Sequence, residues 1–336
     1  MGRTGSVIRP FSESAEVNCR SCSIPLQRTI TDFGADDSFG RGASAKLKEH
    51  YGIEMPETAI RLVTEKHGKA MLEMQRQEPS ELPFRSGVAM LIAETDGSMV
   101  PVVEIAESAP GEPPVDRRKN RKLDWKEGRL SLVHPPGSVT PIFKATMGTV
   151  DEVGKQLWQS AIRAGAGNET RFHCVGDGAP WITNQVDLQF GPRATYLIDF
   201  CHLCEYISSA AEVIATQDKE AWIEEKKDWL KDNRWPDVLN SLQPYVEGET
   251  VPDKDAPVRA CYRYIANRPN FLDYKNALAA GLPIGSGEIE SAHRYVIQAR
   301  LKIAGAWWKI ENAEKMLALR VARVNCDWEK YWAEAA

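Results

Sequence analysis

Val175-Gly-Asp177-Gly-Ala-Pro-Trp181-Ile and Ala194-Thr-Tyr-Leu-Ile-Asp199-Phe-Cys-His202 are the two segments that decide how this chain folds. In each segment a short apolar run ends on an aspartate, which is the pattern of a buried strand. In α/β folds, chemistry collects at the carboxyl ends of such strands. After Asp199, apolar residues recur at helical spacing, so a helix is predicted there with His202 in its first turn. The pattern places both aspartates at one rim of a sheet.

A third aspartate, Asp96, has the same context earlier in the chain. The apolar run Val88 to Ala93 leads to Asp96-Gly97, and a second strand pattern follows from Met99 to Ile105. We therefore expect a hairpin that turns at Asp96-Gly97. Asp-Gly is a favoured hairpin turn that needs no function. The second Asp-Gly pair at a strand end, Asp177-Gly178, favours a functional role over that alternative.

The order of predicted elements defines the fold class. Strand patterns come first, and a strand-helix alternation follows them, which predicts a mixed sheet with helices on both faces in an α/β protein of ribonuclease-H-like type. A tryptophan-rich helical stretch then interrupts the core. The expected divisions are an irregular segment at 1–35, a helix-turn-helix-like region at 36–80, a catalytic core at 87–217, a helical insertion at 218–280 and core-completing helices at 281–336.

Composition narrows the class of protein. The 336 residues are 43% apolar and 26% charged, as in ordinary globular proteins, and the net charge is −5. The longest apolar run is shorter than a membrane-spanning helix, and the first ten residues lack a signal-peptide core, so we expect a cytoplasmic protein without membrane contact. Basic side chains cluster in two places and are candidate DNA contacts, although solvated surface is the simpler explanation of such charge: Arg117, Arg118, Lys119, Arg121 and Lys122, and then Arg294, Arg300 and Lys302.

The N-terminal part contains two weaker signals. Cys19 and Cys22 provide only two of the four ligands of a structural zinc site, so unliganded thiols are expected. Helical patterns on either side of the turn Gly52 to Pro56 resemble a helix-turn-helix. A packed helical hairpin without DNA contact would have the same pattern, and docking geometry alone distinguishes the two.

Three carboxylates are candidates for metal chemistry. Asp96, Asp177 and Glu290, if the fold gathers them, would bind two Mg²⁺ or Mn²⁺ ions about 3.5–4 Å apart, an arrangement that cleaves phosphodiesters. Glu288 competes with Glu290 for the third place, because both follow Ser286, the expected N-cap of a helix. Residues two apart on a helix point roughly 200° apart, so only one can face the sheet. The buried stripe through Ile289 modestly favours Glu290.

Four ordered motifs together resemble a known family. They are Asp96-Gly, Gly-Asp177-Gly-Ala-Pro-Trp-Ile, Asp199-Phe-Cys-His202-Leu-Cys-Glu-Tyr and Gly285-Ser-Gly-Glu-Ile-Glu290, followed by Arg300-Leu-Lys and Trp308. Over residues 15–332 the chain resembles DDE-type insertion-sequence transposases of the ISKra group, related to Mutator-like elements. The resemblance implies a ribonuclease-H-like domain with a helical insertion, an acidic triad at Asp96, Asp177 and Glu290, and an Asp-x-x-His signature at Asp199 and His202.

The same resemblance implies partners and leaves alternatives open. The implied reaction is cut-and-paste transposition, with double-stranded DNA as partner, both the terminal inverted repeats and the target, and a homo-oligomer assembled on it. Family members usually carry a further cysteine pair before the one found here, so one alternative is a shortened or domesticated copy that binds DNA without catalysis. A metal-dependent nuclease without strand transfer is another.

Overall fold

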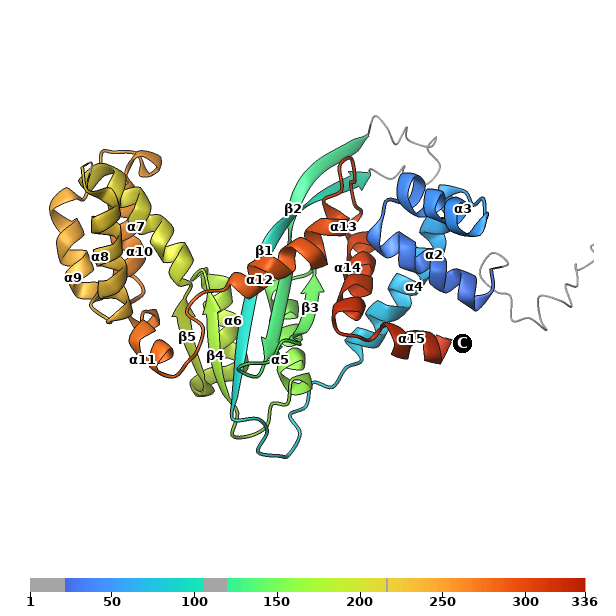
Figure 1. Ribbon diagram of the computed structural model, residues 1–336, viewed down its shortest axis with the longest axis horizontal. Coiled ribbons are helices and arrows are strands. Elements are labelled where there is room, and N and C mark those ends of the chain that lie inside the picture. The colour runs from blue at the N-terminus through green and yellow to red at the C-terminus, as the bar shows by residue number, and fades with distance from the viewer. Residues whose placement is uncertain (1–21, 106–119, 216, 336) are drawn as a thin grey trace, which may run out of the picture.

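A five-stranded mixed sheet forms the centre of the protein (Figure 1). The computed structural model describes residues 22–105, 120–215 and 217–335. The strands are β1 (Met90–Ile105), β2 (Arg121–His134), β3 (Ile142–Thr146), β4 (Arg171–Gly176) and β5 (Ala194–Ile198), in the order β3-β2-β1-β4-β5. β1, β2 and β3 pair antiparallel, whereas β4 and β5 run parallel to β1. The expected mixed α/β class is confirmed.

The hairpin expected at Asp96-Gly97 is wrong. β1 runs without a turn from Met90 to Ile105, and its pairing with β2 continues through both residues, Asp96 opposite Leu130 and Gly97 opposite Arg129. The reason lies in the residues that follow, because Val100 and Val102 are fully buried and continue one face of the strand. Asp96 therefore lies within a strand and not in a surface turn.

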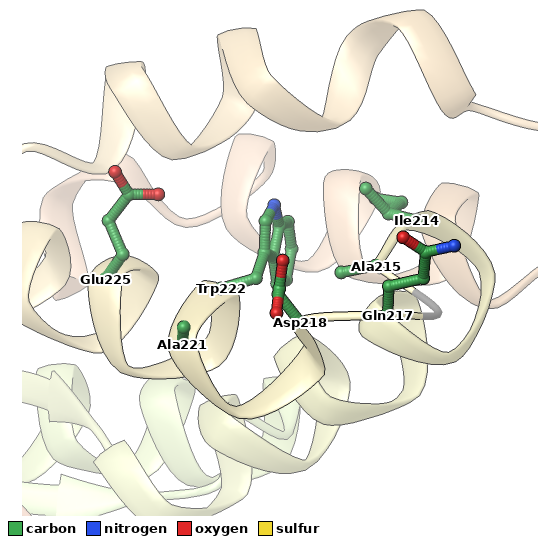
Figure 2. Close-up of a pocket in the computed structure, with 7 residues that line it drawn as sticks. All are labelled: Ile214, Ala215, Gln217, Asp218, Ala221, Trp222 and Glu225. Carbon is green, nitrogen blue, oxygen red and sulfur yellow. The ribbon is translucent and has the colours of Figure 1, made fainter.

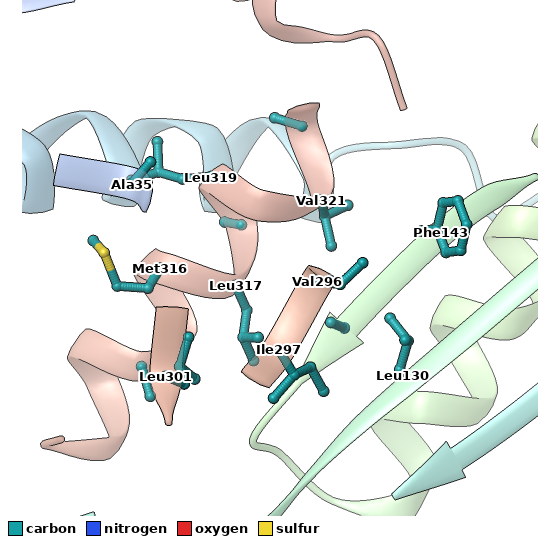
Figure 3. Packing of buried hydrophobic residues seen from close by; sticks show 14 of the residues in the cluster. Ala35, Leu130, Phe143, Val296, Ile297, Leu301, Met316, Leu317, Leu319 and Val321 are labelled. Atoms are coloured by element: carbon teal, nitrogen blue, oxygen red, sulfur yellow. The ribbon is translucent and has the colours of Figure 1, made fainter. Parts of the chain in front are cut away.

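Helices cover both faces of the sheet (Figure 1). α5 (Val150–Arg163) and α6 (Pro180–Phe190) pack on one face, where Leu157 and Ile182 join the cluster that contains Leu91 and Phe172. On the other face lie α12 (Gly287–Ala292), the π-helical turn η6 (His293–Gln298) and α14 (Ile310–Val324). Figure 3 shows the core there, in which Leu130 of the sheet faces Ile297 and Leu317 of these helices.

The tryptophan-rich stretch forms a separate helical layer beside β5 (Figure 1). α7 (Phe200–Ile214) leads into α8 (Lys219–Lys231), α9 (Trp235–Leu242), α10 (Pro257–Ala266) and α11 (Tyr274–Ala279). Trp222 and Trp229 pack against this core, as their spacing of seven predicts, and the Lys226 ammonium lies between their rings, 5.2 and 3.6 Å from the centroids. The insertion shares one hydrophobic core with α7 and with Leu197 and Ile198 of β5.

The N-terminal helices pack against the C-terminal ones. α2 (Ile24–Asp36) and the π-helical turn η1 (Phe39–Ser44) precede α3 (Ala45–Tyr51) and α4 (Glu57–Arg76), which are the two helices of the expected helix-turn-helix. Gly52 ends α3 in the left-handed region, with φ of 66°. α4 packs on both α2 and α14, so close to α14 that a Cβ at Gly68 would lie 2.8 Å from the Lys315 carbonyl oxygen. α4 is thus an integral part of the core.

The C-terminal part, where core-completing helices were expected at 281–336, contains several helices separated by a strand-like segment. α13 (Ala299–Leu301) ends after one turn, and α14 begins only at Ile310. Between them Gly305 has φ of 80°, and Trp308 pairs with β1 through hydrogen bonds to Val103 and Pro101. α15 (Trp328–Ala335) closes the fold. Backbone pairing with β1 overrides helical periodicity here. In the described part of the chain, no helix combines the length and apolarity needed to cross a bilayer.

The buried His67 on α4 links α2 to α15, and its burial predicts that the stability of the fold depends on pH. His67 Nε2 donates to Gln27 Oε1 at 3.0 Å, and its Nδ1 accepts from the Tyr331 hydroxyl at 2.7 Å. Burial lowers the pKa of His67 to about 4. Between about pH 6.5 and 4 the unfolded chain therefore binds a proton at His67 that the folded protein does not, and stability falls as pH falls, by roughly 3 kcal/mol in all. His67→Gln should show a flatter curve in denaturant unfolding over this range. Parallel curves for the two proteins would contradict the assignment.

Candidate functional site

Three aspartates follow the last paired residues of the parallel strands. β1 and β4 pair in parallel up to Glu94 opposite Val175, and Asp96 and Asp177 each come two residues later. β4 and β5 pair up to Gly176 opposite Ile198, and Asp177 and Asp199 are the next residues. The carboxyl ends of neighbouring parallel strands meet at the same edge of a sheet. We call these three aspartates, together with Glu290 on α12, the acidic edge.

Asp96 lies against a histidine that sequence reasoning left without a role. His293 Nε2 lies 3.3 Å from Asp96 Oδ2, and His293 is buried while the Asp96 carboxyl is about one-third exposed. His293 is the first residue of η6, so the helix that follows Glu290 also contacts the strand that carries Asp96. This contact fixes α12 and η6 over β1.

Glu288 and Glu290 point in different directions, as the helical geometry predicts. Glu288 Oε2 lies 3.0 Å from His134 Nε2 at the end of β2. Glu290 instead interacts electrostatically with the aspartates. Burial and then the negative charges of Asp199 and Asp96 raise the pKa of Glu290. Glu290 is thus the glutamate of α12 whose electrostatic neighbours belong to the acidic edge.

A fifth carboxyl, Glu94, was missed. It is 2% exposed and its Oε2 accepts a hydrogen bond of 2.9 Å from the Ile289 backbone N–H, in the middle of α12. Burial raises the pKa of Glu94 to about 8, and the charges of Glu288, Asp199 and Glu290 act in the same direction. The signal was available in the sequence, since Glu94 is two residues before Asp96 and must share its face.

Asp177 is held through its backbone by the helical insertion. Its carbonyl accepts a 2.6 Å hydrogen bond from the Tyr264 hydroxyl on α10, while its Oδ1 accepts from the Ala179 N–H at 2.8 Å. Arg268 stacks on the Tyr264 ring at 4.3 Å and donates to the Gly178 carbonyl at 3.3 Å. The insertion therefore fixes the loop that carries Asp177, and it leaves the second carboxylate oxygen without a hydrogen bond in the described structure.

Asp199 joins the two ends of the insertion. It is 1% exposed, and its Oδ1 accepts from the His202 N–H at 2.8 Å, which caps α7. Its Oδ2 accepts from both the backbone N–H, at 2.6 Å, and the hydroxyl of Ser286, just before α12. Ser286 does not cap α12 with its side chain, contrary to expectation, because that hydroxyl is bonded to Asp199. Both oxygens of Asp199 are thus occupied, and this suits a residue that positions α12.

The His202 side chain is partly exposed and faces the insertion. Its Nδ1 lies 3.5 Å from Glu205 Oε2, and its ring makes edge contacts with Tyr206 and Tyr264, with centroids 5.5 and 5.8 Å apart. Only its backbone N–H contacts Asp199. Tyr264 links His202 to the Asp177 loop.

The acidic edge is not a preformed metal cage. Among the described residues, no three His, Cys, Asp or Glu side chains lie close enough together to hold one metal ion. Asp96, Asp199 and Glu290 are coupled electrostatically, while Asp177 follows the last paired residue of β4. Cys19 lies outside the described residues, and Cys22 is buried.

The basic candidates do not form one surface. Arg121 and Lys122 are exposed at the start of β2, and Arg294 is exposed on η6. Lys302 donates to the Ser98 hydroxyl at 2.9 Å, and Arg300 is only 2% exposed, so it is not the surface contact expected from its charge. Arg117, Arg118 and Lys119 lie outside the described residues.

A hollow of about 610 Å³ lies in the insertion, between the end of α7 and the start of α8 (Figure 2). Trp222, Asp218 and Glu225 line it, and none of its lining residues belongs to the acidic edge. It therefore gives no information on the chemistry of that edge.

The fold and the acidic edge define an α/β protein with clustered carboxylates beside a helical insertion. The chain belongs to the uncharacterised protein family UPF0236, whose family model matches residues 165–334, just over half of the sequence. The match spans Asp177, Asp199, the insertion and Glu290. No curated protein matches the chain.

The contacts of Asp199 predict a coupled loss of stability. Asp199→Asn puts an N–H₂ group where a carboxylate oxygen accepted a hydrogen bond, and it should cost about 1–3 kcal/mol, because buried donors then lose their acceptor. Ser286→Ala should cost about 1 kcal/mol. In a double-mutant cycle measured by urea unfolding, the two changes should be coupled by roughly 0.5–3 kcal/mol.

The exposed Ser209→Ala on α7 serves as the control, with an expected effect below about 0.5 kcal/mol. Additive effects of Asp199→Asn and Ser286→Ala would contradict a stabilising hydrogen-bond link between Asp199 and Ser286.

Proposed function

We propose that this protein is a DNA transposase of the DDE type, with a ribonuclease-H-like catalytic domain that cleaves transposon ends and joins them to target DNA. The observation that carries the proposal is that Asp96, Asp177 and Asp199 follow the last paired residues of neighbouring parallel strands, while the charges of Asp199 and Asp96 act on Glu290 of α12. Carboxylates have no reason to gather in this way for stability alone, since like charges repel.

The sheet supports the finer fold assignment within this proposal. Its order β3-β2-β1-β4-β5, with three antiparallel strands followed by two parallel ones, is the arrangement expected for a ribonuclease-H-like core. The insertion between β5 and α12 fits the same interpretation, since it separates the second aspartate from the glutamate in sequence and returns the chain to the sheet.

Mg²⁺ or Mn²⁺ suits the donor set. Asp96, Asp177 and Glu290 offer hard carboxylate oxygens, and the pKa of Glu290 is raised by burial and then by the negative charges of Asp199 and Asp96. Mg²⁺ sites commonly use one or two protein carboxylates and complete their shell with water and substrate phosphates, so three converging side chains are not required before DNA binds. When bound, two such ions would activate the attacking oxygen and stabilise the leaving oxygen of the phosphodiester.

The other residues position these ligands. His293 contacts Asp96, Tyr264 holds the Asp177 loop, and Asp199 with Glu94 anchors α12 at Ser286 and Ile289. The proposed substrate is double-stranded DNA at the inverted repeats, and a homo-oligomer would bring two ends together. Of the basic candidates, Arg121, Lys122 and Arg294 are exposed in the described structure and could contact phosphates.

Paired substitutions on α12 test the function. Glu290→Gln should reduce Mg²⁺-dependent cleavage of a duplex carrying the inverted repeat that flanks the gene by orders of magnitude, because it removes a ligand. Glu288→Gln lies two residues away and faces His134, so this variant should retain most activity. Cleavage is measured by denaturing electrophoresis of end-labelled DNA at matched concentrations of folded protein.

The two variants control for each other, since each exchanges one glutamate for glutamine on the same short helix. The reverse pattern would assign the ligand to Glu288. Cleavage by neither the wild type nor any variant, with DNA binding retained, would favour a DNA-binding protein without catalysis.

A further inference from the structure

Arg300 is a buried cation that makes no ion pair with a carboxylate in the described part of the chain, and the charges of Asp37 and Asp36 act on it more weakly than burial does. Its side chain is 2% exposed. Burial lowers the pKa of Arg300 to about 10, so the guanidinium keeps its charge at neutral pH. Buried charges are normally paired, and an unpaired one indicates that something else supplies the counter-charge.

The surroundings of Arg300 leave one direction open. The guanidinium carbon lies 4.7 Å from the Phe39 ring centroid and 4.8 Å from that of Trp308, so aromatic rings cover both faces. Nε donates to the Gly34 carbonyl at 3.0 Å, whereas Nη2 is buried without a hydrogen-bond partner. Nη2 therefore has donor capacity left in the plane of the guanidinium, where carboxylate or phosphate oxygens bind.

Arg300 also lines a cavity of about 500 Å³, between η1, α4, the end of β1 and the loop at 302–309. Three cationic side chains, Arg300, Arg61 and Lys309, line it against two carboxylates, Glu57 and Glu65. Glu65 is already neutralised, because it accepts hydrogen bonds from Arg61 at 3.2 Å and from Asn312 at 2.9 Å. The same contact occupies Arg61, Lys309 lies 3.9 Å from Glu311, and Glu57 is exposed to solvent. Among the described cations that line the cavity, Arg300 is therefore the one without an ion pair, and it makes this part of the wall suited to an anion.

The remaining walls are apolar and aromatic. Trp307 lines the cavity with its indole 37% exposed, next to Val103 and Ile105. The cavity has the size of a small-molecule site and is larger than a lone carboxylate or phosphate would fill. A ligand that carries both an anion and a flat ring would use both Arg300 and Trp307. In a nucleotide, the base stacks on an exposed aromatic side chain while the phosphate binds arginine.

We propose that this cavity binds a nucleotide, with the phosphate on Arg300 and the base against Trp307. The nucleotide is either free or part of a DNA strand, since the phosphate chemistry is the same. The site does not depend on the acidic edge, and its occupation would stabilise the junction between the N-terminal helices and the sheet.

Calorimetric titration of the full chain with dAMP, without divalent cations, tests the proposal. The wild type should bind dAMP, and Arg300→Lys should weaken binding about tenfold or more, because lysine keeps the charge but loses the planar guanidinium donors and the stacking. Trp307→Ala should weaken it severalfold, whereas Tyr245→Ala, an exposed aromatic outside the cavity, should not. Circular dichroism checks that each variant is folded.

Two further arms identify the source of the phosphate. Binding of dAMP without binding of a single-stranded oligonucleotide indicates a free nucleotide, while binding of the oligonucleotide, lost in Arg300→Lys, indicates a DNA strand. If Arg300→Lys does not fold, Lys309→Met and the control Lys254→Met replace it, since both lysines are exposed and only Lys309 lines the cavity. Absence of binding in the wild type to every probe, or equal binding in the wild type and the folded cavity variants, would overturn the proposal.

Discussion

Repulsion among carboxylates held at one edge of a sheet is the constraint on which the rest of the structure depends. Asp96, Asp177 and Asp199 follow the last paired residues of β1, β4 and β5, and the charges of Asp199 and Asp96 act on Glu290 of α12. Burial, together with the charges of Glu288, Asp199 and Glu290, raises the pKa of Glu94 to about 8, so it is largely protonated at neutral pH. Such a cluster is stable only with hydrogen-bond donors, protons or a cation among its members.

Hydrogen-bond donors from distant parts of the chain supply much of that compensation. Asp199 accepts from the first turn of α7 and from Ser286 across the insertion, and Glu94 accepts from the backbone of α12. The insertion therefore both separates α12 from β5 in sequence and returns it to the sheet in space. The core that it shares with α7 and β5 lets it act as a rigid spacer, and Tyr264 links that core back to the Asp177 loop.

Local patterns in the sequence predicted the helices and strands better than the contacts between them. Apolar runs ending on Asp177 and Asp199 indicated β4 and β5, and helical spacing indicated α5 and α7. The turn expected at Asp96 failed because strand pairing with β2, which is long-range, decides between a turn and a continuous strand. The bond from Ser286 to Asp199 and the burial of Arg300 likewise depend on partners far away in the chain, which no local pattern encodes.

The central proposal is that Asp96, Asp177 and Glu290 of the acidic edge together bind divalent cations. Calorimetric titration of the folded wild type with Mn²⁺, beside Asp177→Asn and the exposed control Glu249→Gln, tests it most directly. The account predicts saturable binding to the wild type and to Glu249→Gln, and its loss in Asp177→Asn. Unchanged Mn²⁺ binding in Asp177→Asn would contradict the account.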